Sequence, residues 1–147
     1  MEHKHILDLL PYNSPFLFVD ELISLSEDGV TGSYTFKKNE FFYKGHFKNF
    51  PVTPGVILTE CMAQIGVVCF GISLMKIEDF SEKTAIALSN SEMDFYIPVF
   101  PGEKVTVVSE KVYFRFNKLK CKVKMLNNKD EIVARGTISG MMGVRKN

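Results

Sequence analysis

The feature that most constrains the fold is a long apolar stretch, residues 55–75 (GVILTECMAQIGVVCFGISLM). It is long enough to be a transmembrane candidate. Three polar side chains, Thr59, Glu60 and Gln64, fall in its first half, however, and strand-like segments flank it. A helix that is apolar on nearly all sides is also typical of a buried core. We therefore predict a core helix and no membrane span, and such a helix needs cover on most sides.

The rest of the chain predicts the sheet that would supply this cover. Turn signals such as Pro101-Gly102 and Asn127-Asn128 separate segments with the composition of strands. The expected strands are residues 16–25, 30–36, 84–95, 103–116, 118–126 and 131–142; we also expect a short helix at 3–10, an aromatic-rich loop at 37–53 and a polar connector at 76–83. The length of 147 residues suits one domain. We predict an α+β fold over residues 1–147, with an antiparallel sheet wrapped around a long central helix.

Strict alternation in residues 118–125 (KLKCKVKM) predicts a half-buried antiparallel strand. Its lysines share one face and its apolar side chains share the other. We interpret the lysine face as solvated, with a docking patch for an acidic partner as the alternative.

Composition limits the classes of function. The net charge of +1 does not indicate nonspecific binding to nucleic acid. The cysteines, Cys61, Cys69 and Cys121, are odd in number and lack CxxC spacing, so we expect packed, reduced thiols and neither a disulfide framework nor a zinc site. The N-terminal residues are too polar for a secretory signal, and we expect a cytoplasmic protein.

Chemistry is concentrated in residues 45–64, GHFKNFPVTPGVILTECMAQ. His46 falls on a predicted loop, Pro54 and Gly55 begin the helix, and Glu60 lies within its apolar run. A carboxyl group is costly to bury unless something pairs with it or uses it. Together with a nearby histidine it forms an acid/base pair that can work near neutral pH. This pattern favours an enzyme.

This segment resembles the signature GHFPxxPxxPGVLxxEAMAQ of the (3R)-hydroxyacyl-[acyl-carrier-protein] dehydratases of fatty-acid synthesis. LPYNSPFLFVD, residues 10–20, is similar to the LPHRxPFLLVD opening of that family, and DFYIPVFPGE, residues 94–103, is similar to its RFKRPVxPGD turn. The resemblance implies the hot-dog fold, in which an antiparallel sheet wraps a long helix. It also implies a homodimer joined through the sheet edges, often assembled as a trimer of dimers.

The resemblance further implies a substrate attached to the phosphopantetheine arm of acyl carrier protein, with no metal and no organic cofactor. His46 matches the catalytic histidine and Glu60 the catalytic carboxylate, the two coming from different subunits. Gly55 matches the glycine whose N–H faces the thioester oxygen, and Gln64 a glutamine that can bond the carboxylate. The sister family that also isomerises the double bond carries aspartate at the glutamate position, so Glu60 favours plain dehydration.

The chain departs from the family pattern at three places. Lys48-Asn49 stands where the family has Pro-Gly, Tyr96-Ile97 replaces a basic pair, and Asn13-Ser14 departs from the residues that usually follow Leu-Pro in the family opening. The departures leave open the loop conformation, the contacts with carrier protein and the preferred acyl chain, so housekeeping and specialised pathways, such as polyene synthesis, both remain alternatives.

On this hypothesis His46 takes the C2 proton of the substrate, Glu60 protonates the departing hydroxyl, and the Gly55 N–H stabilises the thioester oxygen. A substrate channel would include Phe47, Phe50 and Val56, although aromatic residues such as these more often serve packing. Each site residue also has a structural alternative: a surface histidine, a first-turn carboxylate, a turn glycine, or, for Gln64, a simple i,i+4 partner.

Two other functions are compatible with the sequence. A thioesterase on the same fold would place water near a carboxylate on the helix and would not need His46. A non-catalytic acyl-binding subunit would pair with an active homologue, but the chain retains both candidate catalytic residues.

Overall fold

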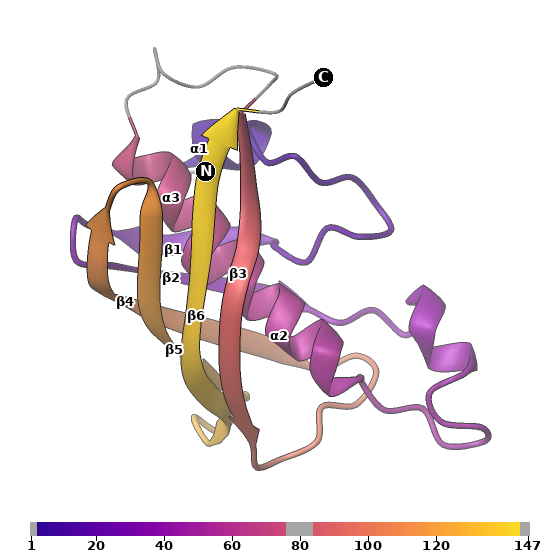
Figure 1. The fold of residues 1–147 in the computed structure, drawn as a ribbon. Coiled ribbons are helices and arrows are strands. Elements are labelled where there is room, and N and C mark those ends of the chain that lie inside the picture. The colour runs from indigo at the N-terminus through magenta and orange to yellow at the C-terminus, as the bar shows by residue number, and fades with distance from the viewer. Residues whose placement is uncertain (1–2, 76–83, 145–147) are drawn as a thin grey trace.

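The computed structural model describes residues 3–75 and 84–144, and in it one antiparallel sheet wraps around a long helix (Figure 1). The sheet has six strands in the order β1-β2-β4-β5-β6-β3. Their bounds are β1 Glu21–Leu25, β2 Gly29–Thr35, β3 Thr84–Phe95, β4 Lys104–Arg115, β5 Lys118–Leu126 and β6 Ile132–Val144. The predicted α+β architecture is confirmed. The connector predicted at 76–83 lies outside the described residues.

The central helix comprises α2 (Gly55–Ala63), the π-helical turn η2 (Gln64–Cys69) and α3 (Phe70–Leu74). It begins after Pro54, whose φ of −60° suits a helix start and whose carbonyl accepts the N–H groups of Ile57 and Leu58. The helix is long and apolar enough to cross a membrane, but 78% of its most apolar window is buried inside the fold. It is therefore the core helix that its polar side chains and flanking strands predict.

The π-helical turn was not predicted. Because a π turn uses i→i+5 hydrogen bonds, it changes which residues share a face before and after it. The carbonyl oxygen of Gly66, within this turn, accepts a 2.9 Å hydrogen bond from the buried Ser109 hydroxyl on β4. The sheet thus holds the irregular part of the helix through a side chain.

The inner face of the sheet packs on this helix. On β5 the apolar residues Leu119, Cys121, Val123 and Met125 are all buried, which confirms the predicted alternation. The largest fully buried side chains include Phe18, Phe36, Phe70, Met62 and Leu119. Cys61, Cys69 and Cys121 are free and buried, as expected.

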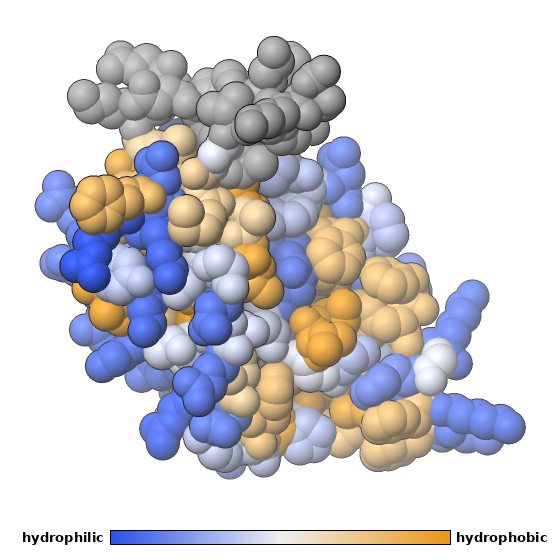
Figure 2. Space-filling view, in the orientation of Figure 1, coloured by the Kyte–Doolittle hydropathy of each residue, from blue (hydrophilic) through white to orange (hydrophobic). Residues whose placement is uncertain are grey.

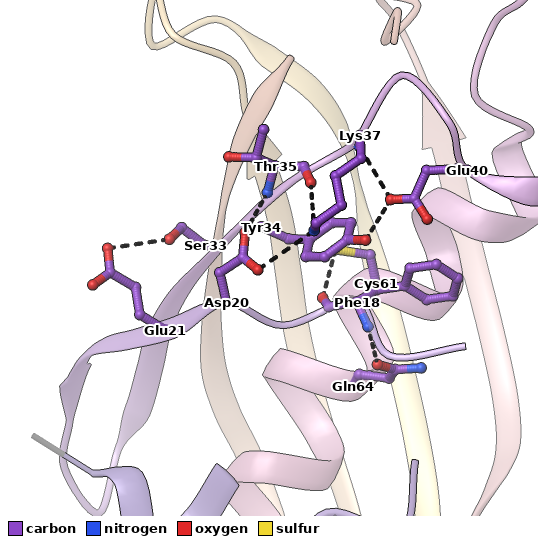
Figure 3. Close-up of polar contacts among 10 residues, drawn as sticks. All are labelled: Phe18, Asp20, Glu21, Ser33, Tyr34, Thr35, Lys37, Glu40, Cys61 and Gln64. Carbon is purple, nitrogen blue, oxygen red and sulfur yellow. Dashed lines mark hydrogen bonds and ion pairs between the residues drawn. The ribbon is translucent and has the colours of Figure 1, made fainter. Parts of the chain in front are cut away.

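The prediction of a strand over residues 16–25 was wrong in its first half, since β1 begins only at Glu21. Asp20, just before β1, still donates its N–H to the Ser33 carbonyl of β2 at 2.8 Å, but the backbone at Phe18 is held by the central helix. The Phe18 N–H donates to Gln64 Oε1 at 2.8 Å, and the Phe18 carbonyl accepts a hydrogen bond from Cys61 Sγ at 3.4 Å (Figure 3). Apolar composition alone does not distinguish this arrangement from a strand.

Other boundaries differ by smaller amounts. The N-terminal helix α1 spans only Lys4–Asp8, and the loop at 37–53 contains a short 3₁₀ helix, η1 (Phe41–Lys44). Strand ends shift by one or two residues, as with β6, which continues past the predicted end at residue 142 to Val144.

Candidate active site

Gly55 is the first residue of α2 and provides a backbone donor at the positive end of the helix dipole. Among the described residues no acceptor is recorded for its N–H. A Cβ at this position would lie 3.3 Å from the ring of Phe95 on β3, which is closer than a comfortable contact. Glycine therefore allows the start of the helix to lie close to β3 while it leaves the N–H available to a ligand.

Glu60 lies further along α2 and is half-buried. Burial raises the pKa of its carboxyl group above the ordinary value, and a hydrogen bond from Gln64 opposes part of this increase. A carboxyl group with a raised pKa is more readily kept protonated near neutral pH. Glu60 is thus suited to donate a proton.

Gln64 connects Glu60 to the N-terminal segment. Its side chain is fully buried, and its Nε2 donates to Glu60 Oε2 and to the carbonyl of Phe16, both at 3.0 Å. Its Oε1 accepts the Phe18 N–H, as Figure 3 shows. The predicted contact with Glu60 is present, and the same amide also anchors the backbone at residues 16–18.

A small cavity of about 60 Å³ borders Glu60. Its walls are mainly apolar: Ala63, Val67 and Val68 come from the central helix, and Ile86 and Leu88 come from β3. The spacing of Glu60, Ala63 and Val67 places them on one helix face. The cavity can therefore receive an apolar group beside the carboxyl group.

His46 lies in the loop between η1 and α2 and is partly buried. Its Nδ1 lies 2.9 Å from the carbonyl oxygen of Val52. Because a carbonyl can only accept, Nδ1 carries the proton in this contact, and Nε2 of a neutral ring is left as the proton acceptor. The ring stacks on Phe47 with centroids 3.9 Å apart, and the His46–Phe47 peptide bond is cis.

The loop that holds His46 accommodates the Lys48-Asn49 departure. Phe47 and Phe50 exchange backbone hydrogen bonds of 2.8 and 2.9 Å across a tight turn. Asn49 in this turn has φ of 63°, a conformation that glycine and asparagine tolerate best. The substitution therefore keeps a residue type that can form the turn.

The structure brings Glu60, Gln64 and Gly55 together on one helix, but His46 is not among the described residues that line the Glu60 cavity. The predicted channel residues Phe47, Phe50 and Val56 do not line it either, and they are 56%, 58% and 76% exposed. Figure 2 shows apolar surface on the side of the molecule where α2 begins and the η1 loop lies. The loop and the cavity thus remain separate within one chain.

The second departure from the family pattern, Tyr96-Ile97, lies just after β3. Tyr96 is half-exposed, and the Arg135 guanidinium lies 5.7 Å from its ring centroid. Ile97 packs against the core, and both N–H groups point to the Val133 carbonyl. This segment is held by β6 without the basic pair of the family pattern.

One residue of the cavity wall was missed in the sequence analysis. Tyr12 lines the cavity together with Glu60, although it is far from residues 45–64 in sequence. Burial, followed by the charge on Glu60, raises the pKa of Tyr12 to about 12. The signal that could have found it is the resemblance of residues 10–20 to the family opening, because that segment contains Tyr12.

Comparisons with known proteins agree with this architecture. The sequence profile of the FabA-like domain family matches residues 10–140. The chain is 35% identical over 126 residues to the 3-hydroxyacyl-[acyl-carrier-protein] dehydratase FabZ of Ruminiclostridium cellulolyticum, covering 84% of this chain and 85% of that protein.

Solved structures show the same fold. A chain of the dehydratase heterocomplex ApeI:P from Xenorhabdus doucetiae superposes with a TM-score of 0.79 at 12% identity, covering 94% of this chain and 90% of that one. The thioesterase HI1161 from Haemophilus influenzae gives a TM-score of 0.62 at 13% identity, covering 86% and 80%. The fold is therefore shared between dehydratases and thioesterases, so similarity of fold does not distinguish the two activities and similarity of sequence is needed. Because the family profile and a relative of this identity each cover most of the chain, the protein belongs to the FabA-like family, among the 3-hydroxyacyl-[acyl-carrier-protein] dehydratases.

Proposed function

We propose that this chain removes water from (3R)-hydroxyacyl thioesters carried on acyl carrier protein and releases trans-2-enoyl thioesters, in the biosynthesis of fatty acids or related lipids. The observation that carries the proposal is Glu60: a half-buried carboxyl group with a raised pKa beside an apolar cavity. A carboxylic acid in such a place can protonate a poor leaving group. The family resemblance and the relatives of this chain support the same reaction.

The proposed chemistry assigns one group to each charge change. His46 Nε2 takes the C2 proton, and the electron pair left on C2 forms the double bond to C3. The Gly55 N–H, at the helix start, stabilises the negative charge that develops on the thioester oxygen. Glu60 gives its proton to the C3 oxygen, which leaves as water.

We further infer that the working unit is a homodimer formed through β3. This strand is an edge of the sheet, 12 residues long, and Leu88 and Phe95 on it are about half-exposed. Long edge strands with apolar side chains are rarely left uncovered in native proteins. Leu88 also lines the Glu60 cavity, so a second copy across this edge would be placed to bring its His46 loop toward Glu60.

The dimer is tested by comparing the sedimentation of two variants, Leu88→Arg and the control Ile23→Arg. The two side chains are 52% and 50% exposed, on β3 and on the opposite edge strand β1. We expect Leu88→Arg to sediment as a monomer and Ile23→Arg to keep the wild-type state. Unchanged sedimentation of both variants would contradict an interface at β3.

The reaction is tested with the purified chain and a 3-hydroxybutyryl thioester, by the enoyl absorbance. Wild type should form the enoyl product, and His46→Ala and Glu60→Gln should each lower kcat by about 10² or more. His5→Ala and Glu27→Gln are the matched controls, since both side chains are exposed, and they should keep wild-type rates. Release of free thiol without enoyl product would instead identify a thioesterase, and an inactive wild-type chain would identify a binding subunit. A cytoplasmic location, as the sequence predicts, is part of the proposal.

A further inference from the structure

The Glu60 cavity is small, and most of the side chains that line it are apolar. A water-sized group needs roughly 10–15 Å³ of cavity volume, so the cavity of about 60 Å³ holds about four to six such groups. That is enough for a hydroxyl group and a few carbons next to it. Among the described lining residues, only Glu60 and Tyr12 bring a polar side-chain group to this space.

Tyr12 and Glu60 face the same space without bonding each other. Among the described residues, no hydrogen bond is recorded for the Tyr12 hydroxyl, whereas Glu60 Oε2 is held by Gln64. The Tyr12 ring packs against the core, so its position is fixed by apolar contacts. Burial, followed by the charge that Glu60 carries when it is ionised, raises the pKa of Tyr12 to about 12, so the phenol stays protonated at any working pH. Tyr12 is thus a fixed neutral donor with an unused O–H.

We propose that Tyr12 is a further catalytic residue of the dehydration, whose phenol O–H donates a hydrogen bond to the 3-hydroxyl oxygen of the substrate from the wall that Glu60 does not occupy. This inference rests on the proposed function. As the C3–O bond breaks, its electron pair leaves with the oxygen, and Glu60 supplies the proton that completes the water molecule. Tyr12 keeps its own proton throughout and stabilises the charge on the departing oxygen. An apolar pocket strengthens such a bond because water does not compete for the donor.

The variant that isolates this role is Tyr12→Phe, which removes one oxygen atom and keeps the ring that packs on the core. A hydrogen bond to a group that gains charge is worth about 10- to 100-fold in rate. We expect kcat for the 3-hydroxyacyl thioester to fall by about that factor. The matched control is Tyr113→Phe on β4. Tyr113 does not line the cavity, and the Arg115 guanidinium lies 4.3 Å from the centroid of its ring. Its kcat should equal that of wild type.

Binding measurements separate a contact with the hydroxyl from a packing role. On a His46→Ala background, where turnover is stopped, the affinities for a 3-hydroxyacyl thioester and for the matching saturated thioester are compared. Adding Tyr12→Phe should weaken binding of the hydroxy compound by about 5- to 10-fold and leave binding of the saturated compound unchanged. Equal loss for both ligands, or no loss for either, would overturn the role of Tyr12.

The same experiment keeps the two proposals distinguishable. If wild type does not form enoyl product, the proposed function is wrong. If wild type is active and Tyr12→Phe has unchanged kcat, only the role assigned to Tyr12 is overturned.

Discussion

Replacing Gln64 by methionine should strongly destabilise the protein, because one buried amide makes three hydrogen bonds. Methionine has a similar length and is apolar, so packing is largely kept while all three bonds are lost. The Phe18 N–H is left buried without an acceptor, which costs about 1–3 kcal/mol. The Phe16 carbonyl and the Glu60 carboxyl group each lose a donor. Because they lie closer to solvent or to the cavity, each loss costs only about 0.5–1.5 kcal/mol of stability.

The expected loss in the free energy of unfolding is therefore about 2–6 kcal/mol, a large part of the about 5–15 kcal/mol typical of a domain. The measurement is urea unfolding followed by far-UV circular dichroism, at one protein concentration because oligomerisation contributes to stability. Asn127→Met is the matched control. Asn127 also makes three side-chain hydrogen bonds, but in an exposed turn where water replaces them, and its loss should be about 1 kcal/mol.

A second readout concerns Glu60. Since the Gln64 hydrogen bond lowers the pKa of Glu60, Gln64→Met should move the carboxyl titration, followed by carbon-13 NMR, to higher pH. The reasoning would be refuted if Gln64→Met unfolded at the wild-type urea concentration, or if it lost no more stability than Asn127→Met.

Three further predictions use the same measurements. A Cβ at Gly136 would lie 1.9 Å from the backbone oxygen of Glu92 on β3, so Gly136→Ala should lower the free energy of unfolding in urea by about 2 kcal/mol or more. Gly143 has nothing within 4 Å of such a Cβ, so Gly143→Ala should change stability by less than about 1 kcal/mol. Equal urea midpoints for the two variants would contradict this prediction. Because Asn49 has φ of 63°, Asn49→Gly should be neutral while Asn49→Val costs about 1–2 kcal/mol, and equal stability of the two would argue against the turn. Burial raises the pKa of Glu60, so the folded state binds the Glu60 proton more tightly than the unfolded state does. The stability that this proton provides is fully present below the ordinary glutamate pKa of about 4.3. It is lost as pH rises through the raised pKa of the folded state. Glu60→Gln should therefore match wild type near pH 4 and be more stable at pH 8, and a difference that does not vary with pH would count against a raised pKa.

The central helix and most strands could be predicted because their patterns are determined locally. The apolar run from Gly55 and the alternation around Leu119 each follow one period, and each period specifies one type of element. Residues 16–20 could not be assigned in the same way. The backbone partners of Phe18 are Gln64 and Cys61, which lie more than 40 positions away, and composition does not reveal such a pairing.

The candidate site shows the same division. His46, Gly55 and Glu60 fall within one short segment, so their spacing was enough to name them as candidates. Tyr12 could not, because only the fold brings it to the Glu60 cavity. The π-helical turn that begins at Gln64 also escaped prediction, since its sequence, QIGVVC, is an ordinary apolar helix by composition.

Gln64 shows why stability and chemistry are coupled in this molecule. A single amide fixes the Glu60 carboxyl group and also the backbone at residues 16–18, a few positions after Tyr12. The relative placement of an acid on the helix and a phenol on the N-terminal segment therefore depends on a buried core contact. A change at Glu60 itself can alter the chemistry and leave this anchor in place, as Glu60→Gln should show by gaining stability at pH 8. A change at Gln64 cannot, because the amide that bonds the Glu60 carboxyl group is the same amide that holds residues 16–18 to the core.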